Sequence, residues 1–419
     1  MSPRRALIFG ASGITGWSLV QEALTYPTPT TFDGVIGLTN RPLTKAEALL
    51  PDDERLFLYS GINLSAGVDA VEAGMERIPG IEGVTHVYFG AYTGHGTGFE
   101  GIKRSNVEIL RNAVLAVEKL CPYLQFWTLQ TGGKACPTTL SFLPFHYWYG
   151  FEFADKIGVP NTPIKESTPR IPEPYASNIM YYAQFDLLDR LSKGKNWSFA
   201  EVRPDGVVCI SPPSNPAPPA NIPHQSGFVP SNNAMNLAQS LALFLSFHAS
   251  RVPRGTHVSY PGPLSAYTAR HSDTSQSRLA RFHIFASLHP GATAGQSFNV
   301  GDEDAGTSWA EKWPLLAAEF GLVGDGPSAD PSAPPLNIQE YMEEHRGEWR
   351  AWVAQQGLKK GALEGTDFGF LTMFMGRAVF GREYDLSKAR GNGWEERGVA
   401  VEGYLEAFRL MRRVGIISA

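Results

Sequence analysis

Apolar and polar residues alternate along the first half of the chain in blocks of two lengths. Short apolar runs predict buried strands at 6–9, 34–38, 56–59, 86–89, 125–129 and 198–202. Longer amphipathic stretches between them predict helices at 17–24 and 103–120, and in the second of these Val107, Leu110 and Val114 keep helical spacing. Strands that alternate with helices are typical of βαβ units and a parallel sheet.

The second half of the chain reads as mainly helical. Apolar spacing predicts helices at 236–249, 275–287, 309–320, 338–356 and 399–414, with short strands at 257–260 and 297–300. The segment 212–230 is rich in Pro, Ser and Asn, which indicates an extended connection. We expect the later strand, within 295–302, to return to the first sheet.

The predicted fold class is therefore α/β, with a Rossmann-type doubly wound parallel sheet and a smaller, mainly helical C-terminal region that covers the substrate. We assign residues 1–211, with 295–302, to the dinucleotide-binding domain. Residues 212–419 form the substrate-binding region. The returning strand makes the two domains interleaved.

A glycine-rich turn follows the first predicted strand. Gly10, Gly13 and Gly16 stand three residues apart within Gly10-Ala11-Ser12-Gly13-Ile14-Thr15-Gly16. In dinucleotide-binding folds such glycines permit the tight turn, let backbone approach the pyrophosphate and let the helix pack close to the strand. The N-terminus of the helix then offers N–H groups to the phosphates. A structural strand–turn–helix uses glycines too, but this position at the first strand favours nucleotide binding.

Composition narrows the class of protein further. The chain has 419 residues, 43% hydrophobic and 18% charged, and a net charge of −5, so it is globular and lacks the basic footprint of a nucleic-acid-binding protein. Its three cysteines, Cys121, Cys136 and Cys209, are too few for a disulfide framework or a zinc site. No apolar run is long enough for a membrane span or a signal peptide. We expect a soluble, cytoplasmic protein with no metal.

Polar residues after the strands indicate which dinucleotide binds. An NAD enzyme usually has an acidic residue after the second strand, and this chain has Asn40 and Arg41 instead. The guanidinium of Arg41 suits a 2′-phosphate and favours NADPH. The alternative is that Arg41 is only a solvated surface residue. Lys134 follows the fifth strand, and Tyr181 opens a predicted helix.

Short-chain reductases normally place tyrosine and lysine four residues apart on one helix face. Only Tyr384 and Lys388 have that spacing here, and they lie far beyond the nucleotide-binding half. Either the protein is not a reductase, or its lysine comes from another segment.

Several segments together resemble the progesterone 5β-reductase/iridoid synthase-like family of atypical extended short-chain reductases. They include the glycine turn, Asn40-Arg41, Leu129-Gln130-Thr131-Gly132-x-Lys134, Asn178-x-x-Tyr181-Tyr182, Arg203-Pro204, Tyr260-Pro261-Gly262 and Ser297-Phe298-Asn299-Val300. The similarity covers nearly the whole chain. In this family the lysine comes from the loop after the fifth strand, where Lys134 stands, and the tyrosine matches Tyr181.

The resemblance implies NADPH-dependent reduction of C=C bonds conjugated to a carbonyl, acting on a small apolar enone or enal. Tyr181 takes the electrophilic role at the carbonyl oxygen, and Lys134 orients it and supplies charge. The full set of predicted cofactor-binding residues combines the glycine turn and Asn40-Arg41 with further positions that the resemblance implies. They are Gly10, Ser12, Gly13, Ile14, Thr15, Gly16, Asn40, Arg41, Asn63, Leu64, Ala91, Tyr92, Gln130, Tyr181 and Val207.

The chain departs from the family at several positions. Plant members often have two arginines where this chain has Asn40-Arg41, which weakens the NADP preference, and Asn63 and Gly133 replace a common aspartate and an arginine. The aromatic stretch Ser141–Phe153 either walls a substrate pocket or packs on the core. Its His146 reads as a hydrogen-bonded loop residue rather than an acid or base.

The sequence leaves alternative functions open. The same phenol also serves simple carbonyl reduction, imine reduction or a cofactor-assisted cyclisation. A non-enzymatic NADP-sensing regulator is a further alternative, although such regulators tend to lack the tyrosine. The oligomeric state is not indicated, and a homodimer is one option.

Overall fold

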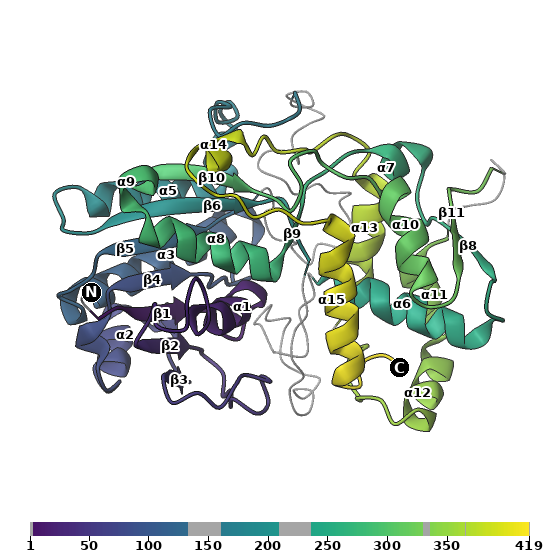
Figure 1. The fold of residues 1–419 in the computed structure, drawn as a ribbon, viewed down its shortest axis with the longest axis horizontal. Helices are drawn as coiled ribbons and strands as arrows, with labels where there is room; N and C mark the ends of the chain where they lie inside the picture. Colours follow the sequence, from purple (N-terminus) through teal and green to yellow (C-terminus); the bar gives the residue numbers. More distant parts are fainter. Residues whose placement is uncertain (1–2, 133–160, 209–235, 330–335, 365, 419) are drawn as a thin grey trace.

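The main sheet of the protein has seven strands, all parallel (Figure 1). The computed structural model describes residues 3–132, 161–208, 236–329, 336–364 and 366–418. Along the sheet the strands follow the order β10-β6-β5-β4-β1-β2-β3. Their bounds are β1 Arg5–Phe9, β2 Gly34–Leu38, β3 Leu56–Tyr59, β4 His86–Phe89, β5 Phe126–Gln130, β6 Ser198–Pro204 and β10 Gln296–Val300. The predicted doubly wound α/β fold is confirmed.

Both faces of the sheet are covered, which explains why its strands are apolar at nearly every position. Side chains alternate between the faces, so Ala6 and Ile8 of β1 enter one hydrophobic cluster and Leu7 and Phe9 enter another. The first face is covered by α1 Ile14–Ala23 and α8 Gln276–Leu288, which pack side by side in front of the sheet (Figure 1). The second is covered by α2 Val68–Met75, α3 Gly98–Leu120 and α5 Met180–Ser192.

The C-terminal part of the chain is mainly helical and lies beyond the carboxyl ends of the strands (Figure 1). Its longer helices are α6 Leu237–Arg251, α10 Trp309–Ala318, α12 Arg346–Gln355, α13 Phe368–Arg377 and α15 Ala400–Arg413. Two shorter ones are α7 Leu264–Thr268 and α11 Ile338–Glu344, whereas α9 Pro290–Thr293 and α14 Ser387–Gly391 pack beside β6 and β10 of the main sheet (Figure 1). Two small parallel sheets complete it, β8 His257–Ser259 with β11 Val323–Asp325, and β7 Gly206–Val208 with β9 Asp273–Ser275.

The strand expected at 297–300 is present as β10 and lies at the edge of the main sheet beside β6. The pairing is parallel and aligns Gln296 with Ala200 and Val300 with Pro204. The C-terminal half of the chain therefore contributes a strand to the main sheet. Among the described residues, no helix combines the length and apolarity needed to cross a bilayer.

The helix expected over 338–356 is divided at His345 into α11 and α12. The imidazole Nδ1 of His345 lies 2.9 Å from the carbonyl oxygen of Tyr341, the same acceptor that its backbone N–H uses at 3.1 Å. Side chains that bond to nearby backbone carbonyls compete with the regular helical pattern. Apolar periodicity continues through such a break, which is why the pattern did not predict it.

Candidate active site

The glycine turn between β1 and α1 is shaped by close backbone contacts. Gly10 has φ +82°, and a Cβ atom there would meet the backbone of Ala91 at 3.0 Å. A Cβ on Gly16 would lie 2.0 Å from the carbonyl oxygen of Gly10, and one on Gly13 would lie 2.8 Å from it. Both the conformation and the space therefore require glycine at this turn.

The N-terminus of α1 remains open to an anion. Its N-cap residue Gly13 provides no side-chain hydrogen bond, and the first turn contains no acidic residue. Ser12 and Thr15 are buried beside the turn, and Ile14 is half-buried. An uncapped helix N-terminus with free N–H groups is the arrangement that binds phosphate in dinucleotide folds.

The segment after β2 presents Asn40 and Arg41 at the carboxyl end of the sheet. The hydroxyl of Thr39 donates to the carbonyl oxygen of Arg41 at 2.5 Å and lies 3.2 Å from Ser60 Oγ, which fixes the backbone here. Asn40 is exposed and Arg41 is half-buried. Burial lowers the pKa of Arg41. Within the described part of the chain, no carboxylate lies within ion-pair distance of its guanidinium.

The two positions after β3 serve different purposes. The side chain of Asn63 caps a short 3-10 helix, Leu64–Ala66, by accepting from the backbone N–H of Ser65 at 3.0 Å. The carbonyl oxygen of Leu64 accepts from the Asn112 amide of α3 at 2.9 Å. The first bond fixes the local turn, and the second holds the backbone of Leu64 against α3.

The structure brings Tyr92 and Tyr181 into one apolar cluster. Both are half-buried and pack against Ile102 of α3 and Met180 of α5. Tyr92 follows Ala91, whose backbone lies against Gly10, so this cluster continues directly from the glycine turn. Two tyrosines that the sequence analysis assigned to the site therefore pack against the same two apolar residues, one from α3 and one from α5.

Tyr181 is the second residue of α5. The start of α5 is tethered to α3, because Lys103 Nζ donates to the carbonyl oxygen of Ser177 at 2.7 Å and Gln184 Nε2 donates to that of Asn106 at 3.1 Å. A helix that connects two parallel strands runs antiparallel to them, so the N-terminus of α5 lies at the carboxyl edge of the sheet. The fold thus places the start of α5, with Tyr181, at the carboxyl edge of the sheet, the edge at which ligands bind in open α/β folds.

The remaining predicted site residues are described only in part. Gln130 ends β5, and within the described residues its buried Oε1 has no hydrogen-bond partner. Val207 lies in β7, of which only the backbone is described. Lys134, with the aromatic stretch Ser141–Phe153, lies outside the described residues.

Tyr384 and Lys388, the pair with the usual reductase spacing, do not share a helix face. Tyr384 precedes α14 and is buried in a β-bridge with Ile164, and burial raises its pKa. Lys388, inside α14, reaches the edge of the main sheet, where it donates to Gln296 Oε1 at 2.8 Å and to the carbonyl oxygen of Ser297 at 3.0 Å. Spacing alone could not reveal this difference.

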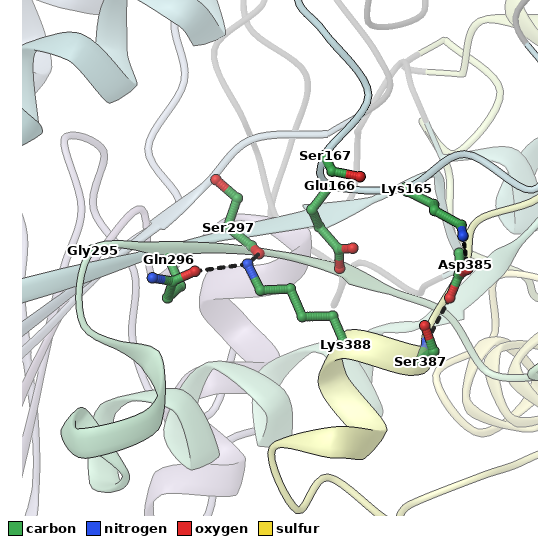
Figure 2. Close-up of a pocket in the computed structure, with 9 residues that line it drawn as sticks. All are labelled: Lys165, Glu166, Ser167, Gly295, Gln296, Ser297, Asp385, Ser387 and Lys388. Atoms are coloured by element: carbon green, nitrogen blue, oxygen red, sulfur yellow. Dashed lines mark hydrogen bonds and ion pairs between the residues drawn. The ribbon is translucent and has the colours of Figure 1, made fainter.

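A polar pocket of about 530 Å³ lies at the free edge of β10 (Figure 2). Its lining residues are Lys165, Glu166, Ser167, Gly295, Gln296, Ser297, Asp385, Ser387 and Lys388. Glu166 accepts the backbone N–H of Asn299 at 2.8 Å. Lys388 donates to the Ser297 carbonyl (Figure 2). Burial raises the pKa of Glu166 and lowers the pKa of Lys388. These two side chains bond to backbone N–H and C=O groups of the edge strand β10 that would otherwise be open for pairing with another strand.

Sequence reasoning missed two buried polar groups near the carboxyl edge. Glu201 in β6 is fully buried, and its carboxylate accepts hydrogen bonds from Thr131, Arg203 and Ser297. Asp205 directly follows β6, lies 3.7 Å from the buried Arg382, and has its pKa raised by burial. The sequence signal for both was a charged residue within or directly after an apolar strand, because burying a charge costs free energy unless it is paired.

The sheet, the glycine turn and the helical C-terminal region together define a Rossmann-fold protein of the short-chain dehydrogenase/reductase type. A crystal structure of DesIV, a dTDP-glucose 4,6-dehydratase from Streptomyces venezuelae, superposes with a TM-score of 0.55 over 98% of this chain and 97% of that chain, at 14% identity. That likeness shows the fold alone.

The chain belongs to the family of PRISE-like Rossmann-fold domains, whose model matches residues 6–418. It is 33% identical over 416 residues to the short chain dehydrogenase sirQ of Leptosphaeria maculans, covering 98% of this chain and 97% of that protein. It is also 25% identical over 360 residues to the (S)-8-oxocitronellyl enol synthase ISY2 of Nepeta cataria, covering 86% and 78%. The resemblance noted in the sequence is confirmed, and the chain is a Rossmann-fold oxidoreductase.

Proposed function

We propose that the protein is an NADPH-dependent reductase of C=C bonds conjugated to a carbonyl group, as in enones and enals. The observation that carries this proposal is that Tyr92 and Tyr181 pack in one apolar cluster, and that Tyr92 directly follows Ala91, whose backbone lies against Gly10 of the glycine turn. This arrangement supports the proposal that a phenol lies beside the bound dinucleotide. Membership of the PRISE-like family and the similarity to an enol synthase support the same class of reaction.

The described residues fit a dinucleotide. The turn at Gly10 and Gly16 leaves no room for a Cβ, as a backbone surface that contacts pyrophosphate requires. Arg41 supplies a cation without a carboxylate partner among the described residues, which suits the 2′-phosphate of NADPH. The buried Oε1 of Gln130 offers an acceptor to a hydroxyl or amide of the cofactor. When bound, the cofactor supplies the hydride.

Tyr181 stabilises the negative charge that develops on the substrate carbonyl oxygen. A phenol with the ordinary pKa of about 10 is protonated at neutral pH and can donate a hydrogen bond there. The cation of Lys134 favours the phenolate and eases transfer of the proton to the enolate, so this lysine keeps its proposed orienting role. The apolar contacts with Ile102 and Met180 limit the motion of the ring.

The proposal is tested by mixing the protein with NADPH and 2-cyclohexenone or a small enal, and identifying the product. A saturated ketone or aldehyde supports conjugate reduction. An allylic alcohol shows carbonyl reduction instead, and NADPH binding without turnover favours a regulator.

Tyr181→Phe identifies the proton donor. We expect kcat to fall by about 10²–10⁴-fold, the range typical for loss of a general acid, with the Kd for NADPH changed less than about twofold. Tyr182→Phe is the matched control, because it removes a neighbouring phenol whose oxygen accepts from the Ile171 backbone at 3.3 Å. Wild-type kcat in Tyr181→Phe would remove Tyr181 from the mechanism.

A further inference from the structure

A buried polar network lies one helical turn from the cluster of Tyr92 and Tyr181. At its centre is Asn106 of α3, which is fully buried. Its side-chain Oδ1 accepts from the backbone N–H of Thr93 at 3.0 Å, and its Nδ2 donates to the Thr93 carbonyl oxygen at 2.7 Å. The same Nδ2 lies 2.9 Å from the carbonyl oxygen of Ile102. Asn106 therefore holds the segment that follows Tyr92 against α3.

Gln184 joins α5 to the same residue. It is buried, and its side-chain Nε2 donates to the backbone carbonyl oxygen of Asn106 at 3.1 Å. A carbonyl oxygen has two lone pairs, so it can accept this bond in addition to a bond within its own helix. The segment after β4, helix α3 and helix α5 are thereby joined through Asn106.

This polar pair repeats the apolar contact between the two helices one turn further along. Asn106 is four residues after Ile102 in α3, and Gln184 is four residues after Met180 in α5. Residues four apart lie on the same face of a helix. Ile102 and Met180 form the core of the apolar cluster that contains the two tyrosines of the candidate site. The polar pair therefore adjoins that cluster along the same helix contact.

The two kinds of contact constrain the helices differently. Apolar packing is non-directional, whereas a hydrogen bond forms only within narrow limits of distance and angle. A buried amide costs free energy unless it is bonded, and a neutral hydrogen bond adds little net stability once it replaces bonds to water. What Gln184 adds to this contact is direction, because an apolar side chain of similar length would fill the space about as well.

The direction of α5 matters for Tyr181. Tyr181 is three residues before Gln184, so the two side chains leave neighbouring turns of one helix face. A rotation of α5 about its axis displaces the phenol, which lies at the end of a long side chain. The bond from Lys103 to the Ser177 carbonyl also holds the start of α5, but it is exposed and competes with water.

We propose that Gln184 is a positioning residue that fixes the rotation of α5 against α3 and so orients Tyr181 relative to Tyr92. This role rests on the proposed function of Tyr181. Gln184 is only 3% exposed, so it acts through Tyr181 rather than through contact with substrate or cofactor.

The test uses two substitutions of Gln184 and a matched control, all in the full-length protein. Gln184→Met keeps the length of the side chain and removes the donor. Gln184→Glu keeps its shape but donates only while the carboxyl is protonated. Gln239→Met is the control, because Gln239 is a fully buried glutamine of α6 whose Nε2 donates to Thr366 Oγ1 at 3.0 Å in the C-terminal region.

Gln184→Met should lower kcat about tenfold or more with the Kd for NADPH within about threefold, because small displacements of a catalytic group cost up to about 10²-fold. A loss confined to kcat is what a displaced phenol produces and a general loss of folded protein does not. Gln239→Met should stay within about twofold of wild-type kcat, since it leaves α5 in place. Equal kcat in the two methionine variants would overturn the proposal.

The kcat of Gln184→Glu should depend on pH more steeply than that of the wild type. Burial raises the pKa of a carboxyl above its ordinary value of about 4.3. While protonated, the introduced carboxyl donates to the Asn106 carbonyl oxygen, and once ionised it repels it. The ratio of kcat in Gln184→Glu to kcat in the wild type should therefore fall at least about threefold between about pH 6 and pH 9. A ratio that remains near one at pH 9 would overturn the proposal.

A double variant tests whether Gln184 acts through Tyr181. In Tyr181→Phe the phenol is already absent, so adding Gln184→Met should change kcat by less than about twofold. Losses that multiply in the double variant would overturn the proposed route through Tyr181.

Amide hydrogen exchange at the start of α5 separates this proposal from the proposed function, because it needs no substrate. Exchange should be faster in Gln184→Met than in Gln239→Met and the wild type. A wild-type protein inactive on enones, with this difference in exchange intact, would overturn only the proposed reaction. Equal exchange in all three proteins would overturn the positioning role of Gln184.

Discussion

Arg41→Ala tests which dinucleotide the protein selects. The guanidinium is half-buried at the carboxyl end of β2, and in the described structure no carboxylate neutralises it. The backbone that carries it is already fixed by the bond from Thr39 to the carbonyl of Arg41. Little conformational freedom of the backbone is therefore lost when a phosphate binds there.

The magnitude follows from the type of contact. A hydrogen bond to a charged group contributes about 1.5–3 kcal/mol, and the partial exposure of Arg41 favours the lower end of that range. Loss of about 1.5–2 kcal/mol corresponds to a Kd for NADPH that rises roughly 10- to 30-fold. NADH has no 2′-phosphate, so its Kd should change less than about twofold.

Fluorescence titration with both dinucleotides measures these affinities, and Lys45→Ala provides the control. Lys45 is four residues away and carries the same charge, but it lies 3.6 Å from Asp52 and donates to the carbonyl oxygen of Asp53 at 2.8 Å. Its loss should change the Kd for NADPH less than about twofold. Equal losses for NADPH and NADH in Arg41→Ala would refute a contact with the 2′-phosphate.

Two further predictions concern the fold. Gly16→Ala would place a Cβ 2.0 Å from the Gly10 carbonyl oxygen, so we expect loss of NADPH binding and a lower Tm. Gly376→Ala is the control, because a Cβ there meets nothing within 4 Å, and it should leave NADPH binding unchanged and the Tm unchanged or higher. A Gly16→Ala protein with normal NADPH binding and Tm would contradict the close packing. Burial lowers the pKa of His86 to about 4 and of His283 to about 3. Below about pH 6.5 these histidines are protonated in the unfolded chain but not in the folded protein. The free energy of unfolding therefore falls by roughly 1.4 kcal/mol per pH unit for each histidine as the pH drops from 6.5 toward the folded pKa. His283→Gln should remove one such contribution in urea unfolding between pH 7 and pH 5, and an unchanged acid sensitivity would show that His283 does not titrate in this way.

The sequence predicted the main sheet well because a parallel strand buried on both faces produces a continuous apolar run. The runs at 34–38, 56–59 and 86–89 match β2, β3 and β4 residue for residue. The glycine turn was equally predictable from the sequence. The φ of +82° at Gly10 and the lack of room for a Cβ atom at this turn both require glycine.

Contacts between segments far apart in the chain could not be predicted from the sequence. The strand pair β7–β9 brings Gly206 to Asp273, and each strand has only three residues, too few for a periodic signal. The bonds of Glu201 depend on which residues lie beside it in β5 and β10, and that register is a property of the assembled sheet. The sequence showed only an isolated charge in an apolar run.

The position of β10 has a consequence for synthesis of the chain. Until Gln296–Val300 has left the ribosome, β6 has no partner on its outer side, because Ala200 to Pro204 pair there with that later segment. A nascent chain of some two hundred residues, or a truncated fragment of that length, would expose an open strand edge and be prone to aggregate. A fragment that is meant to retain the complete main sheet therefore needs the segment through Val300.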